Sequence, residues 1–337
     1  MVDAGLANLL AELKLEGLGG RLEAHTLGGL ADSLKGGRPA FLSMLKEAGV
    51  DKLAERQALS NGLSKAVREG RLGQLSGAPP PRLLFLHGFG NSATIAELQT
   101  MALKAEVCDD VKILEGTVVL AEEQLRTAAG LDADLRKEGL AGTMTLHGWY
   151  PVEVVGGLNH PRSFADVSAA AGAIAEHIVS AGGYDGIVGF SQGASTALVV
   201  AERVAEINER LAPPARRLRF VAGLAVGRNA AVMYRKRAEE AGGGGGAVGG
   251  SGAAEGGGGG AAAESGGPAA GSLAGLSLVL AAGEADELSD QPTLEKIGEQ
   301  ARAAGAVVEV RRYPGGHVLP TAGDQTYAAI KALANSV

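Results

Sequence analysis

The stretch YDGIVGFSQGAS, residues 184–195, decides the fold class of this chain. Its first half is an apolar run typical of a buried strand, and small residues suited to a helix follow Ser191. Gly189, Ser191 and Gly193 form a G-x-S-x-G pattern, in which a serine occupies a tight strand-to-helix turn. Small neighbours are needed because the turn brings the backbone and the helix very close together. The pattern predicts a protruding hydroxyl at a helix N-terminus, where backbone N–H groups stabilise negative charge.

Strand-like and helix-like segments alternate on both sides of this turn. Such alternation predicts an α/β fold with a mostly parallel sheet and helices on both faces. The carboxyl ends of its strands then share one edge, where sites are built. The strand candidates are residues 83–86, 111–116, 184–190, 219–226, 276–283 and 306–313. The helix candidates are residues 93–106, 163–183, 191–211, 293–305 and 321–336.

Residues 241–272 interrupt this alternation. Half of these residues are glycine, and most of the others are alanine, serine or glutamate. A segment of this composition buries too little apolar area to offset the entropy of ordering. A long insertion adds little loop-closure entropy, so we expect a flexible surface insertion inside a domain of residues 82–337.

A proline run separates the alternating region from an all-helical N-terminal region. Residues 77–81 contain three consecutive prolines, which block a helix and predict an extended linker. Apolar spacing in residues 1–76 predicts a small bundle of short helices. Asp51 is the expected N-cap of one of these helices. The residues expected to line the buried side of that helix are Leu53, Leu59, Leu63 and Val67.

Composition bounds the class of protein. The chain has 337 residues, of which 46% are hydrophobic and 20% charged, as in a soluble globular protein with a sizeable core. A net charge of −7 argues against nucleic acid or an anionic membrane as a partner. The single cysteine, Cys108, excludes a disulfide within the chain and favours a reducing compartment. The first residues do not resemble a signal peptide, and no apolar run is long enough to span a membrane, so we expect a cytoplasmic location.

A serine hydroxyl needs a base before it becomes a useful nucleophile. His317 is the favoured base among the six histidines, because YPGGHVLP follows the last strand candidate and returns to the sheet edge that carries Ser191. The weaker candidates are His25 in the helical region, His87 at the end of the first strand, His177 within a helix, and His147 and His160, which the sequence does not place.

The base in turn needs a carboxylate to orient it. Asp286 is the favoured residue because it lies a short turn beyond the strand candidate 276–283. The competing acidic residues in the same loop are Glu284, Glu287 and Asp290. The chain order Ser191, Asp286, His317 is that of α/β-hydrolases.

An oxyanion hole would complete such a site. It requires backbone N–H groups aimed at the position where negative charge develops. The N–H of Gln192, directly after the serine, is one expected donor, and the N–H of Phe89, in the loop after the first strand, is the other. Chemistry of this kind requires neither a metal ion nor an organic cofactor, and we expect none.

With these residues assigned, residues 82–337 resemble the FSH-type serine hydrolases, the α/β-hydrolase family that includes the ovarian-cancer-associated small hydrolases. The segments LFLHGFGNSA, YDGIVGFSQGAS, GEADEL and GGHVLP match its four blocks in order, and HGWYPVE is similar to its aromatic segment. The resemblance implies ester hydrolysis through an acyl-enzyme, with Ser191, Asp286 and His317 as the triad. Two departures concern substrate access: Ser289-Asp290 stand where the family tends to have an apolar residue and proline, and the glycine-rich insertion is foreign to it.

Residues 1–76 resemble a SAM domain or SAM-like helical module. The resemblance lies in LKEAGVDKLAERQALSNGLSKAVREGRL, where a short helix, a Gly-Val turn and a longer closing helix follow one another. It implies contact with a protein partner or self-association through residues 1–76. A helical appendage without a partner is the alternative.

The sequence is compatible with more than one function for the predicted triad. A serine esterase or thioesterase acting on a small acyl substrate is the leading hypothesis. The alternatives are an inactive hydrolase-fold scaffold that binds partners through its helical module, and an acyltransferase that uses the same triad. Trp149, Tyr150 and Tyr234 fit either a substrate pocket or the core.

Overall fold

The structure is a computed structural model that describes residues 2–77, 80–121, 145–155, 158–213, 215–242 and 267–335. It has two compact units, one of Met1–Pro81 with Ala328–Val337 and one of Arg82–Tyr327. Most of the segment expected to be a flexible insertion, residues 243–266, lies outside the described residues, as do residues 78–79 of the expected linker.

The first unit contains short helices around a leucine-rich core. Their bounds are α1 (Ala4–Glu12), the 3-10 helix η1 (Glu16–Arg21), α2 (Leu27–Lys35), α3 (Arg38–Glu47), α4 (Leu53–Arg68) and α5 (Leu72–Leu75). The Asp3 side chain ties two of these helices together, because its Oδ1 accepts from the N–H of Leu6 at 2.9 Å and of Leu27 at 3.1 Å. Leu9, Leu30, Phe41 and other apolar side chains fill the core.

Helix α4 corrects two expectations about this unit. Its N-cap is Lys52 rather than Asp51. Leu59 and Leu63 are buried as expected, but Leu53 is 53% exposed and Val67 is 37% exposed. Leu53 is the first residue of α4 and Val67 lies in its last turn, whereas Ser60, which lies between them around the helix axis, is buried in the middle of the helix.

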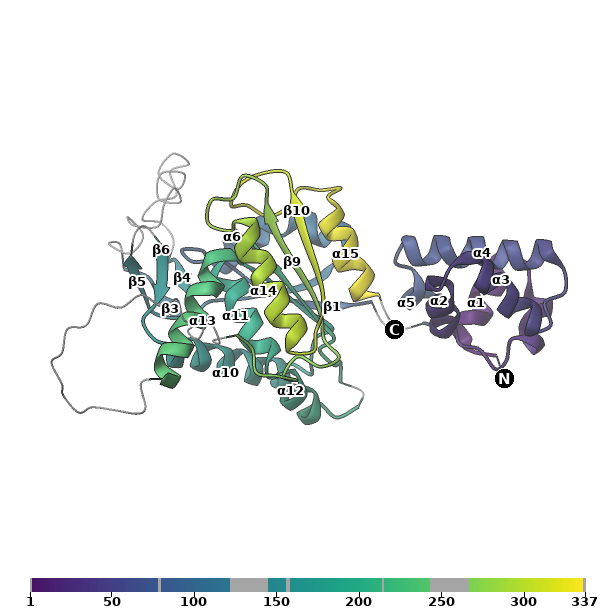
Figure 1. Cartoon of the computed structure of the whole chain (residues 1–337), viewed down its shortest axis with the longest axis horizontal. Coiled ribbons are helices and arrows are strands. Elements are labelled where there is room, and N and C mark those ends of the chain that lie inside the picture. The colour runs from purple at the N-terminus through teal and green to yellow at the C-terminus, as the bar shows by residue number, and fades with distance from the viewer. Residues whose placement is uncertain are drawn as a thin grey trace, which may run out of the picture. The chain divides into compact units, whose positions relative to one another are not determined.

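The second unit is built on a six-stranded sheet in the order β10-β9-β8-β7-β1-β2, with every pair parallel. The strands are β1 (Arg82–Leu86), β2 (Asp110–Leu114), β7 (Gly186–Phe190), β8 (Phe220–Leu224), β9 (Ser277–Gly283) and β10 (Val307–Tyr313). All residues of the central strands β7 and β8 are buried, which explains their continuous apolar character. The α/β fold predicted from the sequence is therefore confirmed, and Figure 1 shows the sheet among its helices.

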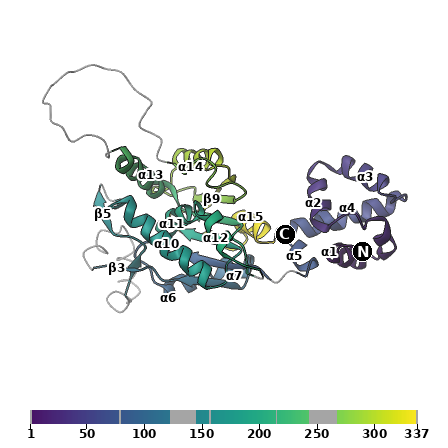
Figure 2. The ribbon, with the colours of Figure 1, turned by 90° about the horizontal axis from the view of Figure 1, so that it is seen from below.

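Helices surround this sheet and fix the position of the strand ends. They are α6 (Ala93–Gln99), α7 (Met101–Glu106), α10 (Phe164–Ser180), α11 (Gln192–Ala201), α12 (Val204–Arg210), α13 (Gly227–Gly242) and α14 (Gln291–Ala303). Helix α15 (Gln325–Ala334) begins in this unit, and its residues from Ala328 onward belong to the first unit. Figure 2 shows α13 and α14 towards the top of the view and α6 and α7 towards the bottom. Helix α11 packs against β7 and β8, and α14 against β9 and β10. Within the described ranges, no helix has both the length and the apolar character needed to cross a bilayer.

Several elements differ from the sequence prediction. The helix expected over 93–106 is two helices that meet at Thr100, whose hydroxyl donates to the Ala96 carbonyl at 2.8 Å. The helix expected over 191–211 is likewise divided, between α11 and α12. Helix α13 and two small antiparallel pairs were not expected. The pairs are β3 (Val118–Val119) with β4 (His147–Gly148), and β5 (Val152–Val155) with β6 (Leu158–Pro161).

Candidate active site

The G-x-S-x-G segment forms the tight turn expected between a strand and a helix. Strand β7 ends at Phe190 and helix α11 begins at Gln192, so Ser191 alone forms the junction. Its φ of 53° lies in the left-handed region, which is strained for a residue with a side chain. The Ser191 N–H donates to the Leu224 carbonyl at 2.8 Å, a bond to the neighbouring strand that holds the turn in place.

The two glycines of the pattern are required by close backbone contacts. A Cβ on Gly189 would lie 2.5 Å from the Gly193 carbonyl oxygen, and one on Gly193 would lie 2.5 Å from the His87 carbonyl oxygen. Both neighbours are backbone atoms, which cannot rotate away as a side chain can. The glycines therefore allow α11 to begin directly against the ends of β1 and β7.

Three side chains predicted from different parts of the chain meet at the carboxyl ends of the strands. Ser191 Oγ lies 2.9 Å from His317 Nε2, and His317 Nδ1 lies 3.0 and 3.1 Å from the two carboxylate oxygens of Asp286. A carboxylate only accepts hydrogen bonds, so Nδ1 carries a proton and donates it. The Asp286 side chain has no exposed surface. In the neutral ring, Nε2 is consequently the nitrogen free to accept the serine proton.

Backbone contacts hold the Asp286 loop. Oδ1 of Asp286 also accepts from the Leu288 N–H at 2.9 Å, and the Ser289 carbonyl accepts from Arg312 Nη1 at 2.8 Å. Asp290 caps α14 through the Thr293 N–H and bonds Arg228 Nε at 3.0 Å. The Ser289-Asp290 pair, which departs from the family pattern, therefore anchors the loop to strand β10 and to helices α13 and α14.

The remaining histidines do not contact Ser191 Oγ. His177 Nε2 lies 3.1 Å from the Tyr184 hydroxyl, and His160 lies on β6. His25 belongs to the first unit. His317 is also packed against Phe190, with ring centroids 5.3 Å apart, which restricts the rotation of the imidazole next to the serine.

The two residues expected to form the oxyanion hole lie beside a common glycine. A Cβ on Gly148 would be 3.0 Å from Gln192 Oε1 and 3.2 Å from Phe89 Cδ2. Gly88, which precedes Phe89, lies next to the nucleophile, because a Cβ there would be 3.4 Å from Ser191 Cβ. The loop after β1 and the start of α11 thus come together around Ser191.

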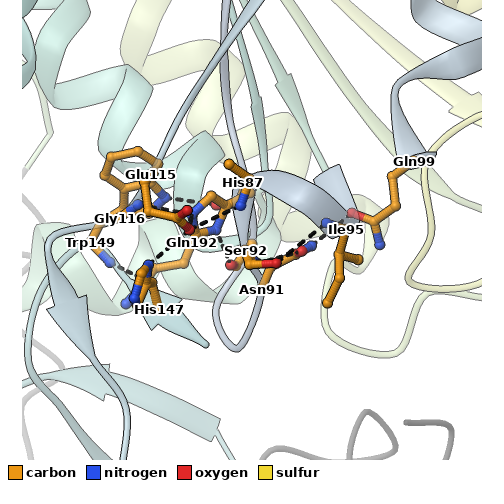
Figure 3. Close-up of polar contacts among 12 residues, drawn as sticks. His87, Asn91, Ser92, Ile95, Gln99, Glu115, Gly116, His147, Trp149 and Gln192 are labelled. Carbon is orange, nitrogen blue, oxygen red and sulfur yellow. Dashed lines mark hydrogen bonds and ion pairs between the residues drawn. The ribbon is translucent and has the colours of Figure 1, made fainter. Parts of the chain in front are cut away.

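A buried polar network that the sequence did not predict supports this region (Figure 3). Gln192 Oε1 accepts from the Trp149 N–H at 2.9 Å, and Trp149 Nε1 donates to the His87 carbonyl at 2.7 Å. His87 Nε2 accepts from the Gly116 N–H at 2.9 Å. Glu115 Oε1 accepts from the Ala93 N–H at 2.9 Å. The sequence feature that could have indicated this network is the segment HGWYPVE, since its tryptophan makes two of these contacts.

The aromatic residues near the site belong to the core. Trp149, Tyr150 and Tyr234 are at most 3% exposed, and burial raises the pKa of both tyrosines. This favours the core over a substrate pocket for all three. In the part of the chain that the structure describes, no group of three His, Cys, Asp or Glu side chains is arranged to hold a metal ion.

Comparison with known proteins identifies the family. The model of the serine hydrolase (FSH1) family matches residues 76–329. Esterase FPY3 of Fusarium mangiferae is 31% identical over 123 residues, which are 36% of this chain and 49% of that protein. The chain thus spans about half the length of the curated relative it matches. The family match begins at residue 76, so the likeness of the helical unit to SAM domains stays a prediction.

Two carboxylesterases of known structure are similar to the chain at low sequence identity. The enzyme from Bacillus cereus is 15% identical with a TM-score of 0.43, over 77% of this chain and 89% of that one. The enzyme from Mesorhizobium loti is 17% identical with a TM-score of 0.43, over 74% of this chain and 86% of that one.

Proposed function

The chain belongs to the FSH1 family of serine hydrolases, and from this premise we propose that it cleaves carboxylic esters or thioesters through an acyl-enzyme on Ser191. One observation carries the proposal: the unbroken series of contacts from Ser191 Oγ through the His317 imidazole to the Asp286 carboxylate, at 2.9 and 3.0 Å. Each of these distances is within hydrogen-bond reach, as proton transfer from Ser191 to His317 and orientation of His317 by Asp286 require.

In the first half of the reaction, His317 Nε2 accepts the hydroxyl proton while Ser191 Oγ attacks the acyl carbonyl. The carbonyl π electrons move onto its oxygen, which becomes the oxyanion of a tetrahedral intermediate. The imidazolium then gives its proton to the leaving oxygen or sulfur as the bond to that atom breaks. Asp286 accepts from Nδ1 throughout and stabilises the imidazolium without taking its proton.

In the second half, water takes the place of the serine hydroxyl. His317 accepts a proton from the water as its oxygen attacks the acyl carbon, and then returns a proton to Ser191 Oγ as the ester bond breaks. The N–H groups of Phe89 and Gln192 are the proposed donors to the oxyanion in both halves. Removal of one such donor typically costs about 10²–10³ in rate.

A hydrolysis screen tests this proposal. Esters and thioesters of graded acyl length are offered to the wild type, to Ser191→Ala and to Ser195→Ala. Ser195 is a matched control because it is a buried serine one turn further along α11, whose hydroxyl bonds the Ser191 carbonyl at 3.5 Å. We expect hydrolysis by the wild type and Ser195→Ala and none above background by Ser191→Ala. Folded wild type without activity on any member of the series would support the scaffold alternative instead.

Acyl transfer uses the same intermediate and is an outcome of the same screen. Adding a series of alcohols and amines to the reaction, with product analysis, separates the two reactions. Hydrolysis predicts free acid as the main product at every acceptor concentration. A transferase would convert most of the acyl group to the new ester or amide.

We propose self-association or a protein partner as the role of the helical unit, on the basis of its resemblance to SAM domains. Exposed Leu53 and Val67 on α4 support a contact surface there. Sedimentation of the full chain at increasing concentration tests self-association, with Leu53→Glu as the variant expected to weaken it. A monomer at all concentrations, for wild type and variant alike, would contradict self-association.

A further inference from the structure

A second buried imidazole lies beside the proposed site and takes no part in the reaction described above. His87 directly follows β1, and its side chain has no exposed surface. It precedes Gly88 and Phe89, the two residues that bring the loop after β1 to the nucleophile. Because burying a polar ring is costly unless its hydrogen bonds are satisfied, the contacts of both ring nitrogens matter.

The hydrogen bonds of His87 define a single tautomer. Nδ1 lies 2.8 Å from the Gly88 carbonyl oxygen, which can only accept, so Nδ1 carries a proton. Nε2 lies 2.9 Å from the Gly116 backbone nitrogen, whose N–H donates, so Nε2 carries none. The ring is therefore neutral, with its one N–H directed at the Gly88 carbonyl.

The surroundings of the ring keep it in this state. Burial lowers the pKa of His87, and His147 adds to the effect, while the Gly88 carbonyl and Glu115 act in the opposite direction. A second proton on Nε2 would face the Gly116 N–H and break that hydrogen bond. Trp149 lies against the ring, with centroids 5.1 Å apart, and restricts its rotation.

Peptide geometry links this imidazole to the proposed oxyanion hole. The Gly88 carbonyl and the Phe89 N–H belong to one planar peptide group and point in opposite directions in its trans form. A bond that holds the carbonyl consequently sets the direction of the N–H. Glycine samples more backbone conformations than other residues, so without this bond the peptide after Gly88 would be poorly restrained.

The other contacts of the loop hold it at its ends. Trp149 Nε1 donates to the His87 carbonyl, and the Gly90 N–H donates to the His147 carbonyl at 3.0 Å. Neither bond involves the Gly88–Phe89 peptide group. The His87 side chain supplies the contact to this group.

We propose that His87 is a positioning residue, whose Nδ1–H holds the Gly88 carbonyl and thereby aims the Phe89 N–H at the oxyanion. This inference rests on the proposed function, because it needs an oxyanion to form on an acyl group at Ser191. His87 itself touches no reacting atom. Its effect is therefore expected on the chemical step and on the binding of tetrahedral analogues, more than on substrate binding.

Two amide variants of His87 separate the hydrogen bond made by Nδ1 from the hydrogen bond made by Nε2. The side-chain amide of His87→Asn reaches the position of Nδ1 and can donate to the Gly88 carbonyl. The longer His87→Gln side chain reaches the position of Nε2 and can accept from Gly116, but it leaves the Gly88 carbonyl without its donor. His87→Ala removes both contacts, and His160→Gln, on β6, is the matched control.

The assay measures kcat and KM on p-nitrophenyl butyrate, per active site titrated with a fluorophosphonate, together with inhibition by an alkyl boronic acid. We expect kcat to fall at least about tenfold in His87→Gln and His87→Ala, with KM changed little. The upper limit is the loss of about 10²–10³ in rate that removal of one oxyanion-hole donor typically causes. His87→Asn should recover most of that loss. Boronate binding should weaken in parallel with kcat. Wild-type kcat in folded His87→Gln, or an equal loss in His87→Asn and His87→Ala, would overturn the proposal.

Nitrogen NMR of the histidine side chains gives a readout that needs neither activity nor a folded variant. In the wild type, the ring assigned to His87 should be the neutral tautomer protonated at Nδ1, the same tautomer that the contact with Asp286 gives to His317. A His87 ring protonated at Nε2 would overturn the inference even if the enzyme hydrolyses esters. A wild type that shows the Nδ1 tautomer but hydrolyses nothing would instead contradict the proposed function.

Discussion

Replacing the Asp286 carboxylate by an amide should change which nitrogen of His317 carries the proton. In the wild type, both carboxylate oxygens lie within 3.1 Å of His317 Nδ1, and Oδ1 also accepts from the Leu288 N–H at 2.9 Å. In Asp286→Asn the amide oxygen keeps the bond to Leu288, because the amide NH₂ cannot accept from a backbone N–H. The NH₂ group then faces Nδ1 and donates to it.

This reversal disables the base. An imidazole that accepts at Nδ1 carries its proton on Nε2, which then faces Ser191 Oγ as a donor. It cannot remove the serine proton, and no carboxylate is left to stabilise an imidazolium. The same substitution in other triads lowers kcat by about 10⁴, or ~5.4 kcal/mol at 1.36 kcal/mol per factor of ten. We expect a loss of that order here.

Initial rates on p-nitrophenyl butyrate give kcat and KM, and thermal unfolding shows whether each variant is folded. Glu287→Gln is the matched control, since it makes the same chemical change at an exposed position one residue along the loop. It should leave kcat within about twofold of the wild type. A folded Asp286→Asn within tenfold of wild-type kcat, or a loss in Glu287→Gln as large, would refute the assignment of Asp286.

Three further outcomes follow from backbone packing and from shifted pKa values. Gly193→Ala should lower the free energy of unfolding in urea by about 1–3 kcal/mol or more, because its Cβ would meet backbone atoms of β1 and of the residue after it. Gly28→Ala, which has open space around it, should not lower it. Equal stability of the two variants would contradict the packing argument. Burial raises the pKa of Cys108 to about 12, so a thiol reagent at pH 8 should label the native protein far more slowly than the urea-unfolded one. Because the pKa of His87 is lowered in the folded state, its contribution to stability is complete above the unfolded value of about 6.5 and is lost as the pH falls below it, by up to ~1.4 kcal/mol per pH unit. The free energy of unfolding in urea should therefore decrease less steeply between pH 7.5 and 5.5 in His87→Asn than in the wild type. Equal slopes for the two proteins would contradict this.

The parts of the fold that the sequence predicted are those determined by local pattern. The four inner strands of the sheet, β1, β7, β8 and β9, lie where apolar runs placed them, because parallel strands buried on both faces are apolar throughout. The edge strands β2 and β10 are only partly buried, and the alternation of strands and helices placed them. The placement of Ser191, Asp286 and His317 beyond strand ends was enough to predict their proximity, because such ends share one edge of a parallel sheet. Their catalytic roles remain our proposal.

The parts that the sequence missed depend on tertiary contacts. The His87 network involves backbone groups of Gly88, Gly116 and Trp149, whose direction no residue pattern reveals. The break at Thr100 depends on a hydroxyl that bonds a carbonyl within its own helix. Helix α13 was not predicted because its last residues lead directly into the glycine-rich segment, whose composition is typical of a chain without regular structure.

The central claim is that Ser191 is the nucleophile and that His317 activates it. Peptide mapping by mass spectrometry after reaction with a fluorophosphonate tests this claim most directly. We predict one adduct per chain, on the peptide that contains Ser191, and its loss in Ser191→Ala and near-complete loss in His317→Ala. An adduct on another residue of the wild type, or ester hydrolysis that persists in Ser191→Ala, would contradict the claim.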